Sequence, residues 1–299
     1  MFLKIEKKFA TIPNGEKIAY IEKGVGEKVI VLIHGNFSGS YHYEPVYKNI
    51  PDNYRIIAPD LRGYGDSSYN TPINTIHDFA DDVVALLKVL GIEKAYIVGW
   101  SLGGCVAQSI AARYDVVEKL ILIASGSVKG YPVFKKDATG RSNVGSLFAN
   151  KEELAQDISI ATMELTERTK NYKMMEAVFN ATIYTSPSQK RPDEESSAIF
   201  LEETCKQVNL VDADWALMHY NISNETSFYS HGEDIAKNIK CPVLALNGKS
   251  DVTVPEIMTS ENRTHIPGLI QKYYDDCGHS LLVDQTEMLV NDILDFVNN

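Results

Sequence analysis

Ser101 is the residue whose surroundings point most directly to chemistry. It lies at the centre of the segment 99–103, Gly-Trp-Ser-Leu-Gly, between an apolar run at 95–98 and a stretch at 104–111 with helical character. A strand that turns sharply into a helix leaves little room beside the turning residue, and glycines two positions before and after provide it. The pattern predicts an exposed serine hydroxyl on a strained backbone; a serine that only shapes a tight turn is the alternative.

A serine hydroxyl is a weak nucleophile and needs a base, which in turn needs an orienting group. Asp251 follows a predicted strand at 242–247, and His279 follows another at 270–274. The carboxyl ends of parallel strands meet at one edge of a sheet, so we expect both side chains near Ser101. The chain order Ser, Asp, His is the one that such a sheet produces.

The sequence is also compatible with other roles for these residues. Asp251 could instead serve only to begin a helix near 255, and His279 could be a core histidine. Asp275, Asp276 or Asp284 could orient His279 instead, although a group beside a histidine in sequence rarely faces its ring.

No metal site or cofactor is expected. His34 precedes a glycine at a strand end and is predicted to hold the following loop. Gly24 and Gly26 lack a third glycine and a following helix, so they do not form a dinucleotide site. The remaining histidines have no metal-ligand spacing: His42, His77, His219, His231 and His265.

The elements that must position Ser101, Asp251 and His279 follow an alternating pattern. Further strands are predicted at 4–11, 17–22, 29–33, 55–58 and 119–124, and further helices at 41–50, 76–90 and 285–297. Alternation at short intervals predicts an α/β fold with a mostly parallel twisted sheet and helices on both faces.

The alternation stops between about 127 and 237. This stretch has no clean strand pattern; helices are predicted at 150–165, 171–183, 193–208 and 211–221. Asn150 is expected to cap the first of them, with an acid at the third helical position. We therefore expect a core formed by 1–126 and 238–299 and a helical cap (lid) insertion at 127–237.

Composition limits the partners. The 299 residues are 44% hydrophobic and carry a net charge of −11, which repels nucleic acid and anionic membrane surfaces. No signal-like segment and no run of about 18 apolar residues is present. Four dispersed cysteines, at 105, 205, 241 and 277, suggest free thiols in a reducing compartment. We expect a cytoplasmic monomer or homodimer with no membrane span.

Several motifs stand together in the order typical of one superfamily. They are His34-Gly35-Asn36, Asp60-x-Arg62-Gly63-x-Gly65-x-Ser67, Gly99-Trp100-Ser101-Leu102-Gly103-Gly104, Gly248-x-x-Asp251 and Gly278-His279. From about residue 16 to the C-terminus, the chain resembles the α/β-hydrolase superfamily, and residues 127–237 lie where that superfamily places its cap.

The resemblance implies roles for the site residues. Ser101 would attack an acyl carbonyl, His279 would take and return its proton, and Asp251 would hold the imidazole. The oxyanion would be bound by the backbone N–H groups of Leu102 and Asn36, with Phe37 as the alternative to Asn36. Each such donor lowers the barrier by roughly 3–4 kcal/mol.

A serine at position 101 excludes some members of the superfamily. Epoxide hydrolases and haloalkane dehalogenases of this fold use an aspartate there. His34-Gly35-Asn36 is similar to the dehalogenase motif, but a serine cannot follow the alkyl-ester route. The possible reactions are hydrolysis of esters, thioesters, lactones or amides, hydrolysis of carbon–carbon bonds, and acyl transfer.

The substrate depends on the predicted cap, whose aromatic and sulfur residues could line an apolar pocket. Most of them should form the cap's own core, and a minority should face the substrate. Tyr41, His42 and Tyr43 could form a polar rim. The pocket candidates are Phe37, Trp100, Tyr131, Trp215 and Met218.

The sequence thus predicts a cofactor-independent serine hydrolase that cleaves a carboxylic ester of small to medium size through an acyl-enzyme. An intracellular hydroxyalkanoate polyester depolymerase is one alternative, because the chain also resembles the polyhydroxybutyrate depolymerases of bacilli. Carbon–carbon bond hydrolysis and cofactor-free perhydrolysis would use the same triad. A ligand-binding sensor on the hydrolase scaffold is the alternative without catalysis.

Overall fold

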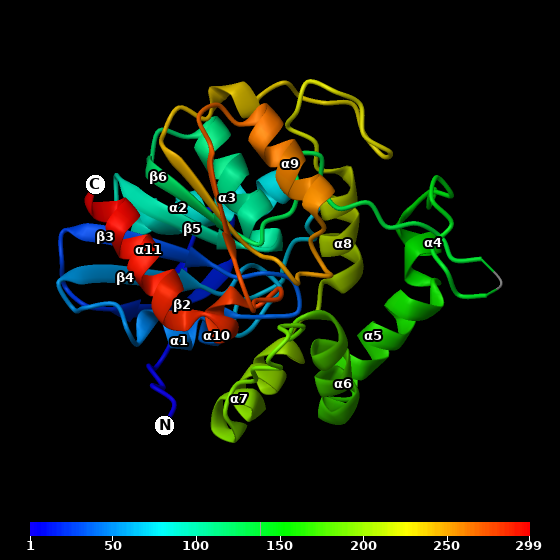
Figure 1. Cartoon of the computed structure of the whole chain (residues 1–299), viewed down its shortest axis with the longest axis horizontal. Helices are drawn as coiled ribbons and strands as arrows, with labels where there is room; N and C mark the ends of the chain where they lie inside the picture. Colours follow the sequence, from blue (N-terminus) through cyan, green and yellow to red (C-terminus); the bar gives the residue numbers. More distant parts are fainter. Residues whose placement is uncertain (138) are drawn as a thin grey trace.

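The computed structural model describes residues 1–137 and 139–299, which fold around an eight-stranded sheet (Figure 1). The strand order is β1-β2-β4-β3-β5-β6-β7-β8. Strands β3 to β8 are parallel to one another, whereas β2 pairs antiparallel with β1 and β4. The mostly parallel sheet is therefore confirmed. The strands are β1 Lys8–Thr11, β2 Lys17–Lys23, β3 Lys28–Ile33, β4 Tyr54–Pro59, β5 Ala95–Trp100, β6 Val117–Ile123, β7 Val243–Gly248 and β8 Ile270–Tyr274.

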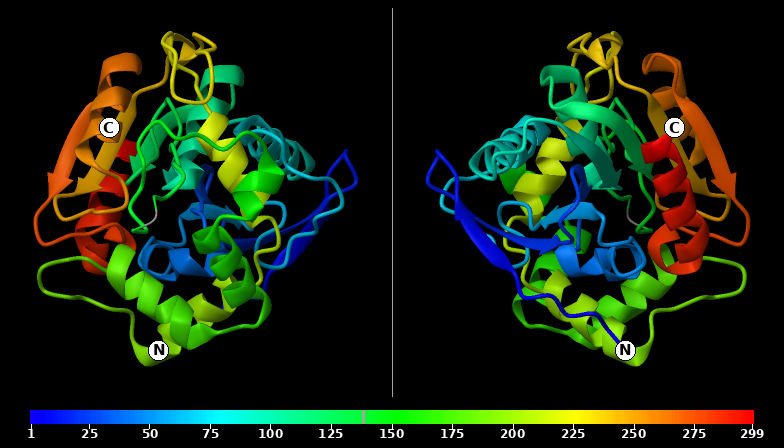
Figure 2. Two further views of the ribbon diagram at one scale, coloured as in Figure 1. Left: turned by 90° about the vertical axis from the view of Figure 1, so that its right-hand side faces the viewer. Right: turned by 90° about the vertical axis from the view of Figure 1, so that its left-hand side faces the viewer.

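Helices cover both faces of the sheet, which explains the continuous apolar runs in its strands. Side chains of β3 alternate between two cores: Val31 and Ile33 pack toward α2 and α3, whereas Ile30 and Leu32 pack toward α1 and α11. Figure 2 shows α2 and α11 on opposite sides of the sheet. The helices of the two faces are α2 Ile76–Val89, α3 Leu102–Arg113, α9 Glu256–His265, α1 Glu44–Tyr47, α10 Leu281–Asp284 and α11 Thr286–Asn298.

The described residues between β6 and β7 form five α-helices and the short 3₁₀ helix η2 Ala236–Asn238. Figure 1 shows α6, α7 and α8 beyond one end of the sheet. Residues of these three helices line a pocket together with residues that follow β3, β5 and β8. The five are α4 Lys151–Ala155, α5 Ile158–Arg168, α6 Tyr172–Thr182, α7 Glu194–Thr204 and α8 Leu210–His219.

Local hydrogen bonds shift some predicted boundaries. The single helix predicted at 150–165 is two helices, because the Asp157 side chain accepts hydrogen bonds from the amides of Ser159 and Ile160 and begins a second one. Asn150 caps α4 as predicted. The helix predicted at 41–50 is a 3₁₀ turn, η1 Ser40–Tyr43, followed by the short α1. β1 begins at Lys8, four residues later than predicted.

Among the described helices, none is long and apolar enough to cross a membrane.

Candidate active site

Ser101 lies at the junction of β5 and α3 with φ 57° and ψ −120°. Left-handed backbone of this kind is strained for a residue with a side chain. The flanking glycines permit it: a Cβ on Gly99 would lie 2.2 Å from the carbonyl oxygen of Gly103, and a Cβ on Gly103 would lie 2.3 Å from that of Ile33. The sharp turn with an accessible serine therefore requires glycine at both positions.

His279 and Asp251 form a hydrogen-bonded pair. The distance from His279 Nδ1 to Asp251 Oδ2 is 2.8 Å, and both side chains are 2% exposed. Asp251 Oδ1 accepts hydrogen bonds from the amides of Thr253 (2.8 Å) and Val254 (2.9 Å), which fix the carboxylate. Because the Nδ1 proton faces the carboxylate, the neutral ring keeps its lone pair at Nε2. This arrangement is that of a base with an orienting acid.

The acids that are near His279 in sequence have other partners. Asp276 accepts hydrogen bonds from Ser188, and Asp284 accepts one from the amide of Gly278. The His279 ring is oriented by Asp251, which is distant in sequence and comes from the loop after the neighbouring strand.

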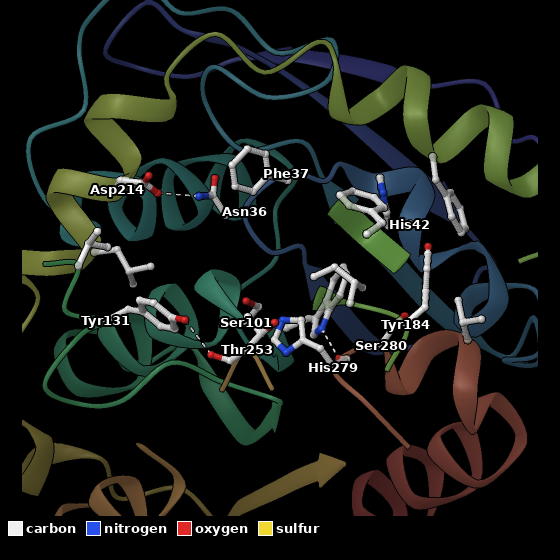
Figure 3. Close-up of a pocket in the computed structure, with 17 residues that line it drawn as sticks. Asn36, Phe37, His42, Ser101, Tyr131, Tyr184, Asp214, Thr253, His279 and Ser280 are labelled. Atoms are coloured by element: carbon white, nitrogen blue, oxygen red, sulfur yellow. Dashed lines mark hydrogen bonds between the residues drawn. The ribbon is translucent and has the colours of Figure 1, made fainter. Parts of the chain in front are cut away.

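Ser101 and His279 line the same pocket (Figure 3). In the described part of the chain, no hydrogen bond joins the Ser101 hydroxyl to the His279 ring. Such contacts are often long without substrate and tighten when it binds. Trp100 holds the backbone of His279, because its indole N–H donates to the carbonyl oxygen of this residue at 3.1 Å.

Two backbone amides near Ser101 are available for an oxyanion. Leu102 is the first residue of α3, so its N–H is one of the unpaired donors of a helix start. In the loop after β3, the amide of Phe37 donates to Gln207 Oε1 at 3.0 Å. The amide of Asn36 donates to no described residue. Of the two alternatives predicted for the second donor, Asn36 is the one that is free.

His34 holds the loop that carries Asn36. Its Nε2 accepts a hydrogen bond from the amide of Leu61 at 2.9 Å, and its Nδ1 lies 2.8 Å from the carbonyl oxygen of Gly35. Burial lowers the pKa of His34 to about 4, so the ring is neutral. A neutral ring with its proton on Nδ1 satisfies both contacts, as the predicted structural role requires.

The pocket is a cavity of about 230 Å³. Phe37, Trp100 and Tyr131 line it, as expected. His42 also lines it, but Tyr41 and Tyr43 do not: their hydroxyls donate to the carbonyl oxygens of Ile5 and Ile33 in the interior. Six apolar residues complete most of the wall: Val133, Phe179, Ile183, Phe200, Leu217 and Val283.

Trp215 and Met218 were expected at the pocket but lie outside its lining. Met218 is buried in a cluster with Phe148 and Leu154, and Trp215 packs against the same cluster. Helix α8 turns a different face inward, with Asp214 and Leu217 three residues apart. Sequence reasoning missed Asp214, because α8 has two acids and its pattern does not show which of them faces inward.

The pocket holds little positive charge. No lysine or arginine of the described chain lines it. Burial lowers the pKa of His42 to about 3 and raises that of Asp214 to about 7. The pocket therefore suits neutral or cationic groups better than anions.

A separate group of acids, Asp60, Asp66 and Glu203, lies close together outside the pocket. The ammonium group of Lys7 lies among them, 2.8 Å from Asp60 Oδ2 and 2.9 Å from Asp66 Oδ2, and also contacts Glu203. Since this cation already binds all three carboxylates, the group is an ion-pair cluster that connects the N-terminal segment to α7.

The chain belongs to the alpha/beta hydrolase fold family, whose model matches residues 28–286. The match confirms the superfamily predicted from the motifs, and the eight-stranded sheet agrees with it.

Individual relatives differ in their reactions. The chain is 24% identical to a cis-3-alkyl-4-alkyloxetan-2-one decarboxylase from Shewanella oneidensis, over 95% of this chain and 86% of that one. It is also 24% identical to a 2-hydroxy-6-oxononadienedioate/2-hydroxy-6-oxononatrienedioate hydrolase from Paraburkholderia phymatum, over 94% and 91%. An esterase structure from Exiguobacterium antarcticum superposes with a TM-score of 0.75 at 19% identity, over 98% of this chain and all of that one.

Proposed function

We propose that this protein is a serine hydrolase that cleaves neutral carboxylic esters through an acyl-enzyme, with Ser101 as nucleophile, His279 as base and Asp251 as orienting acid. The observation that carries the proposal is the 2.8 Å hydrogen bond between Asp251 and His279, in a pocket that Ser101 also lines. The fold family and the esterase with the same fold support this class of reaction.

In the first half of the reaction, the Ser101 hydroxyl attacks the ester carbonyl and its proton passes to His279 Nε2. The amides of Leu102 and Asn36 bind the oxyanion. Asp251 stabilises the imidazolium that forms, because it already accepts the Nδ1 proton. Collapse of the tetrahedral intermediate releases the alcohol, which takes the proton from His279 and leaves the acyl group on Ser101.

In the second half, a water molecule attacks the acyl-enzyme and gives its proton to His279. The same two amides bind the second oxyanion, and its collapse returns the proton to Ser101 and releases the carboxylic acid. No step requires a group beyond the residues of this chain and water.

The pocket favours esters over the dicarboxylates named for the Paraburkholderia relative. A dianion would enter a cavity whose described lining has no lysine or arginine and includes Asp214. Burial of an unpaired charge is costly. The apolar wall and the volume of about 230 Å³ instead suit a neutral ester of small to medium size.

Hydrolysis of p-nitrophenyl esters with acyl chains of two to twelve carbons tests the proposal. We expect turnover that falls by several orders of magnitude in Ser101→Ala. The matched control is Ser109→Ala, since this serine lies on the same helix but outside the pocket lining and hydrogen-bonds His77. Turnover that survives in Ser101→Ala contradicts the assignment of the nucleophile. Ligand-dependent association with a second protein, without turnover of any ester, would favour a sensor.

A further inference from the structure

The pocket has two unlike halves. Figure 3 shows Asp214, Asn36 and Tyr131 on one side of Ser101, and His42 and Tyr184 on the other. In the second half, Phe200 of α7 stacks on the His42 ring, and Phe179 of α6 packs edge-on against His42 and Tyr184. An ester bound at Ser101 would therefore place its two ends in different environments.

Among the described residues, the Asp214 carboxylate has one hydrogen-bond partner. Asn36 Nδ2 donates to Asp214 Oδ1 at 2.8 Å. The orientation of this amide is fixed, because Asn36 Oδ1 accepts hydrogen bonds from the Tyr64 hydroxyl (2.8 Å) and from Gln207 Nε2 (2.9 Å). The NH₂ end of Asn36 must therefore face Asp214, which acts as an acceptor in this contact.

The second oxygen of Asp214 is open. Among the described residues, none donates a hydrogen bond to Oδ2, and no described cation forms an ion pair with this carboxylate. Tyr131 lies nearby in the pocket, but its hydroxyl is used, because it donates to the carbonyl oxygen of Thr253 at 2.9 Å. Asp214 keeps some accessible surface, and it lines the pocket. A bound molecule can therefore reach it.

A second carboxyl group without a hydrogen-bond partner on one of its oxygens lies close enough to interact with Asp214. Glu167 on α5 is 3% exposed, and its Oε1 has no hydrogen-bond partner among the described residues. Burial and the charge of Asp214 raise the pKa of Glu167 to about 9. At neutral pH Glu167 is therefore protonated and uncharged, and it does not line the pocket, so Asp214 is the carboxyl group among the described lining residues that a bound molecule can reach.

We propose that Asp214 determines substrate specificity by accepting a hydrogen bond from a hydroxyl or protonated amine on the ester, while the apolar end of the ester occupies the half formed by α6 and α7. This inference rests on the proposed function and narrows its substrate class. A site that pairs a buried polar group with the substrate discriminates strongly against the analogue that lacks the donor.

The test uses esters that differ only at one branch point. Each set has three esters, which carry a methyl, a hydroxyl or an ammonium group at the same carbon. The sets differ in the position of that carbon, which runs from the third to the sixth carbon of the acyl chain or of the alcohol. For at least one donor-bearing ester we expect kcat/KM about 10- to 100-fold above that of its methyl isostere, as for one charge-assisted hydrogen bond.

Asp214→Asn should reduce this ratio. The new side chain can offer its oxygen to Asn36 and must then turn an NH₂ group toward the pocket. The preference for the ammonium ester should disappear. The preference for the hydroxyl ester should fall less, because a hydroxyl group can also accept a hydrogen bond from the new NH₂ group. Asp212→Asn is the matched control, because Asp212 lies on the same helix and pairs with Lys151 outside the pocket lining.

The outcomes are distinguishable. If Ser101→Ala abolishes turnover but no donor-bearing ester is preferred, the inference fails and the proposed function stands. An equal loss on all three esters in Asp214→Asn also overturns it, because Asp214 then only orients Asn36. If the wild-type protein hydrolyses no ester and a fluorophosphonate does not label Ser101, the proposed function fails and the inference falls with it.

Discussion

Both oxygens of the Asp251 carboxylate are used, one by the His279 ring and one by two backbone amides. The backbone contacts fix the orientation of the carboxylate independently of the histidine. The tautomer of His279 therefore depends on a carboxylate that is held in place. Loss of that charge should affect catalysis far more than the fold.

Asp251→Asn is predicted to lower kcat for ester hydrolysis by about 10³- to 10⁴-fold. An amide at this position can turn its NH₂ group toward Nδ1 and favour the wrong tautomer of His279. Steady-state kinetics on the best p-nitrophenyl ester measures the effect. Asp276→Asn is the control, since Asp276 bonds Ser188 instead. Equal losses in the two variants would argue against Asp251 as the orienting acid.

Glu167 should make stability depend on pH. Its pKa is raised to about 9 by burial, so the native state holds the proton more firmly than the unfolded chain between about pH 4.5 and 9. The wild-type free energy of unfolding should therefore fall as the pH rises through this window, by at most about 1.4 kcal/mol per pH unit.

Glu167→Gln removes this dependence. The free energy of unfolding of the wild-type protein minus that of Glu167→Gln should be lower at pH 8 than at pH 5. Denaturant unfolding of both proteins at the two pH values measures this difference. Glu202→Gln on α7 is the control, because that side chain is exposed. A stability difference between wild type and Glu167→Gln that does not change with pH would show that Glu167 is not a buried acid.

At the scale of elements, the strands and the site-bearing loops could be predicted because their signals are local. Runs such as 29–33 and 120–124 are apolar on both faces, and the turn at Ser101 has its glycines within two residues. Helix ends were less predictable, because a side-chain cap such as Asp157 competes with a continuing helical pattern. The packing between elements decides which acid of α8 faces the pocket, and the local sequence pattern does not predict this choice.

Helix α7 is connected to the core through Lys7. This side chain is 4% exposed and bonds carboxylates from the loop after β4 and from α7. Lys7→Met should lower the free energy of unfolding by about 3–5 kcal/mol, because it leaves buried carboxylates without their cation. Urea unfolding measures this, with Lys8→Met as the control, since the Lys8 side chain is 58% exposed. Equal stability of the two variants would contradict a coupling role for Lys7.

At the scale of the whole molecule, the fold family followed from the order of motifs, whereas the substrate did not. Asp251, His279 and Ser101 come from loops after three different strands, and a parallel sheet brings such loops to one edge. The pocket wall instead combines residues after β3 with residues of α6, α7 and α8. Its shape depends on how five helices pack, and the sequence predicts their existence better than their arrangement.

If Ser101 is the nucleophile, it carries the acyl group during turnover. Rapid acid quench of the wild-type protein with a p-nitrophenyl ester, followed by peptide mass spectrometry, tests it most directly. We predict a mass increase equal to one acyl group on the peptide that contains Ser101, and none in Ser101→Ala. Turnover with the acyl group on another residue, or with no covalent intermediate on fast quenching, would contradict it.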